Sequence, residues 1–266
     1  MTSIEKPQRL PDSLLSQGRH TVTTEEAQRL LGGSPEASRR ALARLADAGQ
    51  LFAAGRGLYV VIPPEFRTWR TVPASHFIDE LMRVRERRYY VALLSAAELH
   101  GAAHQAPQVF QVLVDRPLAD RDFERVRVRF LVGKHVAEHP GEGVETRNTP
   151  TGTMRVAGRE LTAIDLVEYA GAVGGLDHVA TVLAELDGLD GAMLATLAAR
   201  RDRAVARRLG WLLERFGEED VDLEPLRAVA QPDAGAATGL RPRPAGRGPR
   251  DSGWGVRVNA DVEPDP

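Results

Sequence analysis

The side chains best suited to chemistry in this sequence are arginines and serines that gather within residues 34–48. Guanidinium groups form paired hydrogen bonds with guanine edges and with phosphates, and serine hydroxyls bind phosphate oxygens. This combination indicates contact with nucleic acid. Arg39 and Arg40 are candidates for bases or phosphates, and Arg44 is a candidate for the backbone or for an acidic neighbour. The full set in this stretch is Ser34, Ser38, Arg39, Arg40 and Arg44.

A helix must position these side chains, and the stretch carries the signals of one. Ser34 can accept a hydrogen bond from the first turn, and Pro35 stands at the first helical position, where a missing N–H costs nothing. Apolar residues recur at three- and four-residue spacing, which predicts a buried stripe and leaves the arginines on the opposite face. The stripe consists of Ala37, Ala41, Leu42 and Leu45, and the opposite face of Ser38, Arg39, Ala43 and Arg44, with Arg40 at its margin.

The segments around this helix predict a winged helix-turn-helix. A short helix over 10–16 and a β-like segment over 21–23 come first. A helix over 23–31 then ends at two glycines, and residues 50–62 predict a hairpin that turns at 55–57. In that architecture the second helix of the motif enters the major groove of DNA, and the hairpin, or wing, reaches the neighbouring groove or backbone. A small helical packing domain with solvated arginines is the alternative.

Two further candidates lie outside the central helix. Arg56 stands at the turn of the hairpin, where it can enter the minor groove or hold a phosphate. Thr24 stands at the start of the 23–31 helix, which Thr23 or Thr24 can cap with Glu26 nearby. We therefore add Thr24 and Arg56 to the DNA-binding candidates.

Composition limits the class of protein. The chain has 266 residues, of which 42% are hydrophobic, so it can form two domains with a sizeable core. Its net charge is only −2, but residues 1–62 contain eight Lys or Arg against six Asp or Glu, which favours a local basic surface at the N-terminus. The sequence has no cysteine, no signal-peptide pattern and no apolar run long enough to cross a membrane, so we expect a cytoplasmic protein.

A change of pattern after Pro63 and Pro64 predicts a second domain of the α+β class. Two helical segments, at 75–88 and 90–99, precede short β-rich segments, and helical spacing returns from Leu161. Residues rich in Pro, Gly and Arg then predict an extended or mobile arm. We expect a winged helix-turn-helix at 8–63, a mixed α+β domain at 72–230 and an extended tail at 231–266, with a late strand at 254–259 as an open option.

Two other groups of arginines could form an auxiliary basic surface. One lies on a strand pattern at 125–132, where arginines alternate with Val or Phe. The other lies on a long helical segment, where residues three and four apart share a face. Both could instead be ordinary solvated charge. The residues concerned are Arg125, Arg127, Arg129, Arg200, Arg203 and Arg207.

The sequence contains no complete catalytic or metal-binding motif. His100 and His104 have helical metal-ligand spacing after Glu98, but Gly101 interrupts them and no third ligand is evident. The nucleophile-elbow, P-loop and dinucleotide-binding motifs are absent. A nucleotidyltransferase would follow its Gly-Ser with Asp-x-Asp, and the second carboxylate is missing after Asp47. We therefore expect no enzyme activity, no metal and no cofactor.

The segment Tyr89 to Val114, YYVALLSAAELHGAAHQAPQVFQVLV, resembles the characteristic segment of the AbiEi family. These proteins are the antitoxins of bacterial abortive-infection, or type IV, toxin–antitoxin systems. The preceding winged-helix pattern and the C-terminal WGVRVN at 254–259 are similar to actinobacterial members, and the resemblance covers about residues 8–260. The absent Asp-x-Asp fits the antitoxin rather than its toxin.

The resemblance implies a DNA-binding autorepressor of its own operon that recognises inverted repeats in the promoter. It also implies that the C-terminal domain is associated with antitoxicity and cooperative DNA binding. The partner implied is a nucleotidyltransferase-like toxin that is neutralised without a stable complex. The alternative function is a protein-interaction module that holds a partner toxin, with DNA binding secondary.

Overall fold

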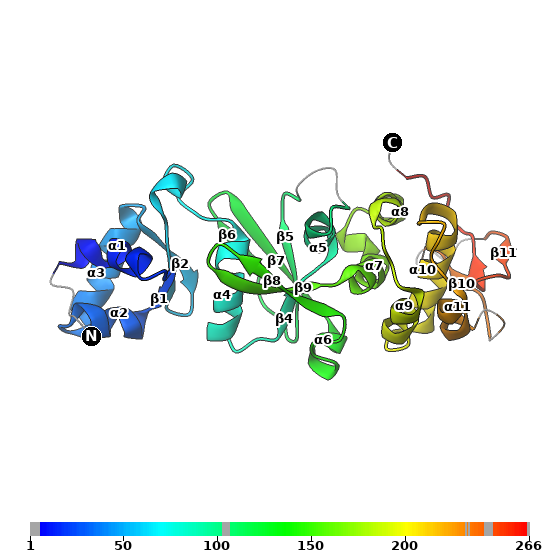
Figure 1. The fold of residues 1–266 in the computed structure, drawn as a ribbon, viewed down its shortest axis with the longest axis horizontal. Helices are drawn as coiled ribbons and strands as arrows, with labels where there is room; N and C mark the ends of the chain where they lie inside the picture. The colour runs from blue at the N-terminus through cyan, green and yellow to red at the C-terminus, as the bar shows by residue number, and fades with distance from the viewer. Residues whose placement is uncertain (1–5, 103–106, 232, 234, 242–246, 265–266) are drawn as a thin grey trace. The chain divides into compact units, whose positions relative to one another are not determined.

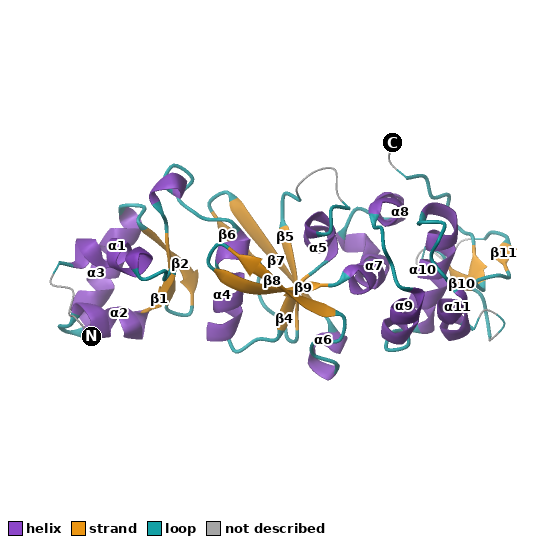
Figure 2. Ribbon diagram, in the orientation of Figure 1, coloured by secondary structure: helices purple, strands orange, loops and turns teal. Residues whose placement is uncertain are grey.

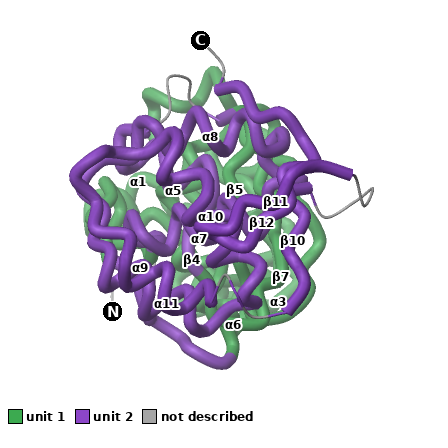
Figure 3. Tube along the Cα trace, turned by 90° about the vertical axis from the view of Figure 1, so that its right-hand side faces the viewer, with its two compact units in different colours: residues 1–89, 108–137, 146–155 green, residues 90–107, 138–145, 156–266 purple. Residues whose placement is uncertain are grey.

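The computed structural model describes residues 6–102, 107–231, 233, 235–241 and 247–264. The chain divides into two compact units, one made of residues 1–89, 108–137 and 146–155 and the other of residues 90–107, 138–145 and 156–266 (Figure 3). Helices and strands occur in both units, so the chain has the mixed α+β class predicted from the sequence (Figure 2).

The N-terminal part of the first unit has three helices and a small sheet (Figure 1). The sheet has the order β1-β3-β2 with antiparallel pairs, and a register shift occurs between Ala53 and Gly55. Leucines of all three helices form one core with residues of the sheet, including Leu14, Leu30 and Leu42. The elements are α1 (Leu10–Ser16), β1 (Thr21–Thr23), α2 (Thr24–Leu31), α3 (Pro35–Asp47), β2 (Leu51–Gly55) and β3 (Leu58–Val61).

Local capping explains where α2 and α3 begin. At α2, the Glu26 N–H donates to Thr23 Oγ1 at 3.2 Å and the Thr23 N–H donates to the Glu26 carboxylate at 2.9 Å, so Thr23 is the cap. At α3, the Ala37 N–H donates to Ser34 Oγ at 3.2 Å, and Pro35 follows as the first helical residue. Both boundaries agree with the sequence prediction to within one residue.

The buried side of α3 is rotated slightly from the predicted stripe. Ala41, Leu42 and Leu45 are buried as expected, but Ala37 is exposed and Ser38 is buried. The Ser38 hydroxyl donates to the Gly32 carbonyl at 3.4 Å, which gives this inward polar group a partner. The assignment of Ala37 to the core and of Ser38 to the outer face was wrong.

A six-stranded sheet follows, in the order β6-β7-β5-β4-β9-β8. β5 and β7 pair in parallel with Phe110 opposite Val128, β4 and β9 pair in parallel at Val91 and Val156, and β6 and β7 are antiparallel. The elements are α4 (Ile78–Val84), β4 (Tyr89–Val91), β5 (Phe110–Val114), β6 (Arg121–Phe123), β7 (Val126–Val132), α6 (Lys134–Glu138), β8 (Val144–Thr149) and β9 (Gly152–Ala157).

Tyr89 to Val91 form a strand where the sequence predicts the start of a helix at Tyr90. All three side chains are buried, as befits a central strand covered on both faces. A strand buried on both faces lacks the alternation of apolar and polar residues that identifies a half-buried strand. From sequence alone, a short apolar run of this kind cannot be distinguished from a segment of buried helix. The helix predicted over 75–88 is also shorter and covers only Ile78–Val84.

The second unit is mainly helical. Its helices bury Leu161, Leu183, Leu194 and Leu209 in a common apolar interior. A sheet of three short strands, in the order β10-β12-β11, lies near its C-terminus. The elements are α5 (Leu93–Leu99), α7 (Arg159–Glu168), α8 (Leu176–Glu185), α9 (Gly191–Ala198), α10 (Arg203–Phe216), α11 (Glu224–Ala230), β10 (Thr238–Gly239), β11 (Arg250–Asp251) and β12 (Val256–Arg257).

The described residues after Gln231 are packed within the second unit, although their composition predicts an extended or mobile arm. Leu240, Trp254 and Val256 are fully buried, and the Arg227 guanidinium lies 4.2 Å from the centre of the Trp254 ring. Three apolar anchors, rather than the Pro and Gly content around them, decide the conformation of this segment. Residues 242–246 of the predicted arm lie outside the described residues.

Gly210 of α10 makes room for Trp254. A Cβ at residue 210 would overlap the six-membered ring of Trp254, so we expect Gly210→Ala to destabilise the protein by about 1–3 kcal/mol even though alanine is the better helix former. Urea unfolding would measure this loss. Adding Trp254→Leu to Gly210→Ala should cost less than the sum of the two single changes, because the larger ring is gone. Equal stability of Gly210→Ala and the parent protein would contradict this packing.

Candidate nucleic-acid interface

The outer face of α3 presents three arginines to solvent. Arg39, Arg40 and Arg44 are exposed, while Leu42 and Leu45 on the same helix are buried in the core of the N-terminal part. No hydrogen bond or ion pair within the described residues occupies these three guanidinium groups. They are therefore available to an external partner, as the sequence predicts for a groove-binding helix.

Ser34 and Ser38 differ in accessibility. Ser34 is exposed at the N-terminus of α3, where backbone N–H groups also face outward and favour an anion. Ser38 has only 2% of its surface exposed, so it cannot contact a groove. The inclusion of Ser38 among the DNA-binding candidates was wrong, because the helix turns this position inward.

Thr24 fixes the hairpin to α2. Its hydroxyl donates to the Gly57 carbonyl at 3.1 Å, and its backbone N–H donates to the same carbonyl at 2.8 Å. The Thr24 side chain is half-buried, and its hydrogen bond to Gly57 holds the hairpin turn against α2. Thr24 therefore acts on the position of Arg56, which is exposed at that turn with a left-handed φ of +48° between two glycines.

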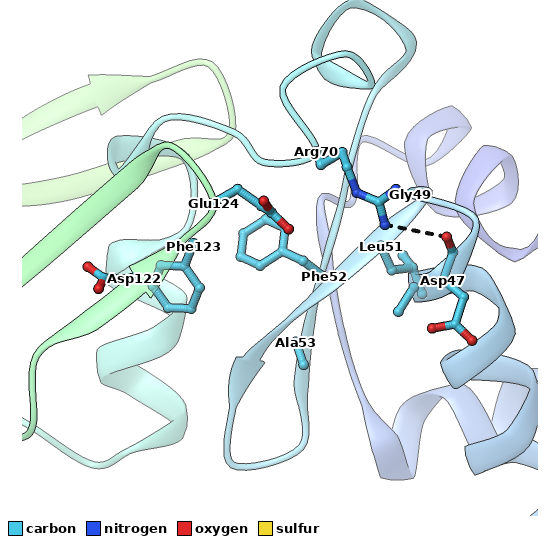
Figure 4. Close-up of a pocket in the computed structure, with 10 residues that line it drawn as sticks. Asp47, Gly49, Leu51, Phe52, Ala53, Arg70, Asp122, Phe123 and Glu124 are labelled. Carbon is cyan, nitrogen blue, oxygen red and sulfur yellow. Dashed lines mark hydrogen bonds between the residues drawn. The ribbon is translucent and has the colours of Figure 1, made fainter.

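A pocket lies at the C-terminal end of α3 (Figure 4). Arg70 reaches across Gly49 and donates to the Asp47 carbonyl at 3.4 Å, which satisfies a free carbonyl of the last helical turn. Phe52 and Phe123 face each other in the pocket with ring centres 5.4 Å apart, and each also stacks edge-on against Phe77 at 5.3 Å. This aromatic cluster joins the hairpin to β6 and α4 within the first unit.

The arginines on β7 have the predicted alternation. Arg127 and Arg129 are exposed, whereas Val128 and Phe130 are buried. Arg125, just before the strand, is exposed as well. Arg129 lies 3.8 Å from the Asp120 carboxylate, a distance typical of a weak surface ion pair.

The second predicted basic group is divided between surface and interior. Arg200 and Arg203 are exposed, and Arg200 lies 3.6 Å from the Glu142 carboxylate. Arg207, by contrast, is 3% exposed. Its guanidinium donates to the carbonyls of Ala230, Gln231 and Ala236 at 2.7 to 3.0 Å. The assignment of Arg207 to a basic surface was wrong, since it is a structural cation that holds the start of the C-terminal segment.

A buried polar network in the second unit was not predicted. The Tyr90 hydroxyl donates to Asp165 Oδ2 at 2.8 Å. Arg201 approaches Asp165 Oδ1 at 3.5 Å and Glu168 Oε2 at 2.9 Å, and its side chain is only 6% exposed. The sequence gives Arg201 the same appearance as its neighbour Arg200, so spacing alone could not find the network.

Burial dominates the electrostatics of this network. It raises the pKa of the fully buried Asp165 to about 7, while the guanidinium of Arg201 and the hydroxyl of Tyr90 act in the opposite direction. Burial also raises the pKa of Glu168 and the pKa of Tyr90. The network therefore holds Asp165 near the point of protonation at neutral pH.

Asp165 should make stability depend on pH. Its pKa is raised in the folded state, so the folded protein binds the proton more tightly and stability falls as pH rises from about 4 to about 7. At about 1.4 kcal/mol per pH unit, this contribution is on the order of 4 kcal/mol. Asp165→Asn should remove that part of the slope, as measured by urea unfolding across this range. The exposed control Asp220→Asn should keep the parent slope, and an unchanged slope in Asp165→Asn would contradict the assignment.

No metal site emerges from the described part of the chain, where no group of three or more His, Cys, Asp or Glu side chains is placed to hold an ion. His100 Nε2 lies 2.7 Å from the Ala157 carbonyl, which gives this ring a structural partner. His104, the other member of the predicted spacing, lies outside the described residues. Among the helices of the described residues, none has the length and apolar character needed to cross a membrane.

Two comparisons with known proteins found matches for this chain. Residues 90–215 match the family model described as the AbiEi antitoxin C-terminal domain. The chain also resembles the crystal structure of the RV2827C protein from Mycobacterium tuberculosis, with 18% sequence identity and a TM-score of 0.66. That match covers 96% of this chain and 92% of the other, and at this identity it concerns the fold alone. No curated protein matched the sequence.

Proposed function

Because residues 90–215 of this chain carry an AbiEi antitoxin C-terminal domain, we propose that the protein is the antitoxin and the DNA-binding autorepressor of a type IV toxin–antitoxin operon. The resemblance of Tyr89 to Val114 implied the same family from the sequence. The proposal has two parts, a DNA-binding N-terminus and an antitoxin C-terminal domain.

The exposed arginine face of α3 carries the DNA-binding part. Helix, turn, helix and hairpin follow one another in the order of a winged helix-turn-helix, with α3 as the second helix of the motif. Arg39, Arg40 and Arg44 point away from the core, and the Arg56 turn is held against α2 by Thr24. In this proposal α3 reads the major groove and the β2–β3 hairpin is the wing.

One such module covers only a few base pairs. Two copies on an inverted repeat would place their helices about 34 Å apart, or a multiple of that distance, on one face of the duplex. Repression then follows from occupancy of the protein's own promoter. Such a spacing can be tested by moving the two half-sites apart by half a helical turn, which should weaken binding.

The antitoxin part rests on the family of the C-terminal domain. The partner proposed is a nucleotidyltransferase-like toxin encoded beside this protein, and we expect neutralisation without a stable complex. Co-purification of the two proteins tests this point directly. A stable one-to-one complex would instead favour the alternative, in which the second unit holds the toxin and DNA binding is secondary.

The decisive experiment compares the protein's own upstream DNA with scrambled DNA of equal length across a range of salt concentrations. Sequence-specific binding should persist at about 150–200 mM salt, whereas binding through phosphates alone falls steeply for both duplexes. A preference for the upstream DNA supports the autorepressor. Equal binding to both duplexes would contradict it.

A further inference from the structure

An arginine in the first unit is buried directly behind the hairpin turn. Arg85 follows α4 and has 9% of its surface exposed. Its guanidinium lies against Gly55 of β2, where a Cβ would stand 2.6 Å from Nη2. Gly55 has a φ of +110°, so both its conformation and the space beside it suit glycine. The hairpin is thus shaped around a buried cation.

This cation has no counter-charge among the described residues. Nε of Arg85 and Nε of Arg87 are both buried, and neither has a hydrogen-bond acceptor in the described part of the chain. No ion pair joins either guanidinium to a carboxylate within the same residues. A buried donor without an acceptor is costly, and a buried charge without a partner is more so. Arg85 and Arg87, two residues apart, therefore each keep a buried donor N–H that an acceptor could satisfy.

The charges around Arg85 are positive. Burial lowers its pKa, and the nearby cations Arg121, Arg56 and Arg87 lower it further. These residues come from three places: the hairpin turn, the segment after α4, and the first position of β6. The charges of these three arginines act on the Arg85 guanidinium beside Gly55, so the local field favours an anion.

We propose that Arg56, Arg85, Arg87 and Arg121 bind one phosphate group beside the hairpin. Guanidinium groups match phosphate with paired, charge-assisted hydrogen bonds, and the buried Nε atoms would gain the acceptor they lack. The phosphate can belong to a DNA backbone or to a free phosphate compound. We assign it to DNA, a step that rests on the proposed function and extends it to residues outside the winged helix.

The position of the site suits a backbone contact. Arg56 is exposed at the turn, so a phosphate held there would lie where the wing meets its duplex. Phosphate contacts fix orientation and add affinity without reading sequence. The site would thus set how α3 lies in the groove without selecting bases itself.

Inorganic phosphate tests the site without any DNA. At constant ionic strength, phosphate should raise the Tm of the parent protein more than chloride does. Arg85→Met should lose this response, and Arg121→Gln should weaken it. Arg83→Gln is the matched control: Arg83 is an exposed arginine on α4 whose Nε donates to the Glu80 carboxylate at 2.8 Å, so its phosphate response should remain.

The melting temperature in chloride gives a second readout. Because Arg85→Met removes an unpaired buried charge, its Tm in chloride should equal or exceed that of the parent. A parent protein that phosphate does not stabilise would overturn the site. The same conclusion holds if Arg85→Met melts normally and still responds to phosphate like the parent. If Arg85→Met does not fold, Arg121→Gln on the exposed strand decides the question in the same assay.

Scrambled duplex DNA then identifies the source of the phosphate. The slope of log affinity against log salt should fall by about 1 in Arg85→Met relative to the parent and to Arg83→Gln. A phosphate response with an unchanged slope would support the site and overturn the DNA assignment in favour of a free phosphate compound. Should the parent bind no duplex, the proposed function fails, while the Tm response still decides whether the arginines bind phosphate.

Discussion

Replacing Arg39 and Arg40 together by alanine should abolish the preference for operator DNA while leaving the Tm within about 1 °C of the parent. Both side chains are exposed on α3 and neither has a partner within the described residues, so folding loses almost nothing. Operator preference rests on paired contacts to base edges, each contributing about 1–3 kcal/mol of discrimination. Losing two should reduce the preference by at least about 30-fold. Competition binding with operator and scrambled duplexes measures it.

A matched double variant distinguishes the loss of base-specific contacts from the loss of two positive charges. Lys6→Ala with Arg9→Ala also removes two exposed cations from the first unit, but from the segment before α1. This control should lose a little affinity for both duplexes and keep the operator preference. An Arg39→Ala, Arg40→Ala protein that binds operator as tightly as the parent would refute α3 as the reading helix.

The elements that carry this first prediction could be placed from the sequence because their signals are local. Thr23 with Glu26, and Ser34 with Pro35, satisfy the first N–H groups of their own helices, so no distant contact is needed to fix where α2 and α3 begin. The hairpin turn at 55–57 is equally local, since its two glycines have positive φ. Such features are set by neighbours in the chain and can be recognised there.

Two of the errors concern which side of an element faces inward. Ser38 was placed outside because it is polar, yet the Gly32 carbonyl accepts its hydroxyl hydrogen and allows it to be buried. Arg207 was placed outside because it is charged, yet three carbonyls of the C-terminal segment surround it. In each case the partner is a backbone oxygen, and any residue can supply that group. A sequence pattern of side chains cannot reveal it.

The sequence also does not show which arginines are structural and which are free to bind a partner. Lys6 and Lys134 are the only lysines, so nearly every cation is Arg and residue type does not distinguish a structural role from a binding role. Arg200 and Arg201 are adjacent, but one is exposed beside Glu142 and the other is enclosed by Asp165 and Glu168. Arg200 and Arg201 differ in burial and in their carboxylate partners, and both of these properties depend on the fold.

The buried member of this pair leads to a second large expected effect. Arg201→Ala should destabilise the protein by about 3–5 kcal/mol near pH 8, because it leaves Asp165 fully buried without its cation. Arg201 lowers the pKa of Asp165, so that pKa should rise further in the variant. At pH 5 Asp165 is already protonated in the parent protein, so the loss there should be smaller by about 1 kcal/mol. Urea unfolding at pH 5 and pH 8 measures the loss of stability and its dependence on pH.

Arg200→Ala is the matched control for this effect, since it removes the neighbouring cation from an exposed pair. Surface pairs contribute little, and we expect its cost to stay below about 0.5 kcal/mol at both pH values. A large loss in Arg201→Ala that does not change with pH would mean that Arg201 acts through its aliphatic stem and not through its charge. A loss that grows with pH only in Arg201→Ala would establish the network as a charge-dependent element of the second unit, apart from the exposed arginines proposed to bind DNA.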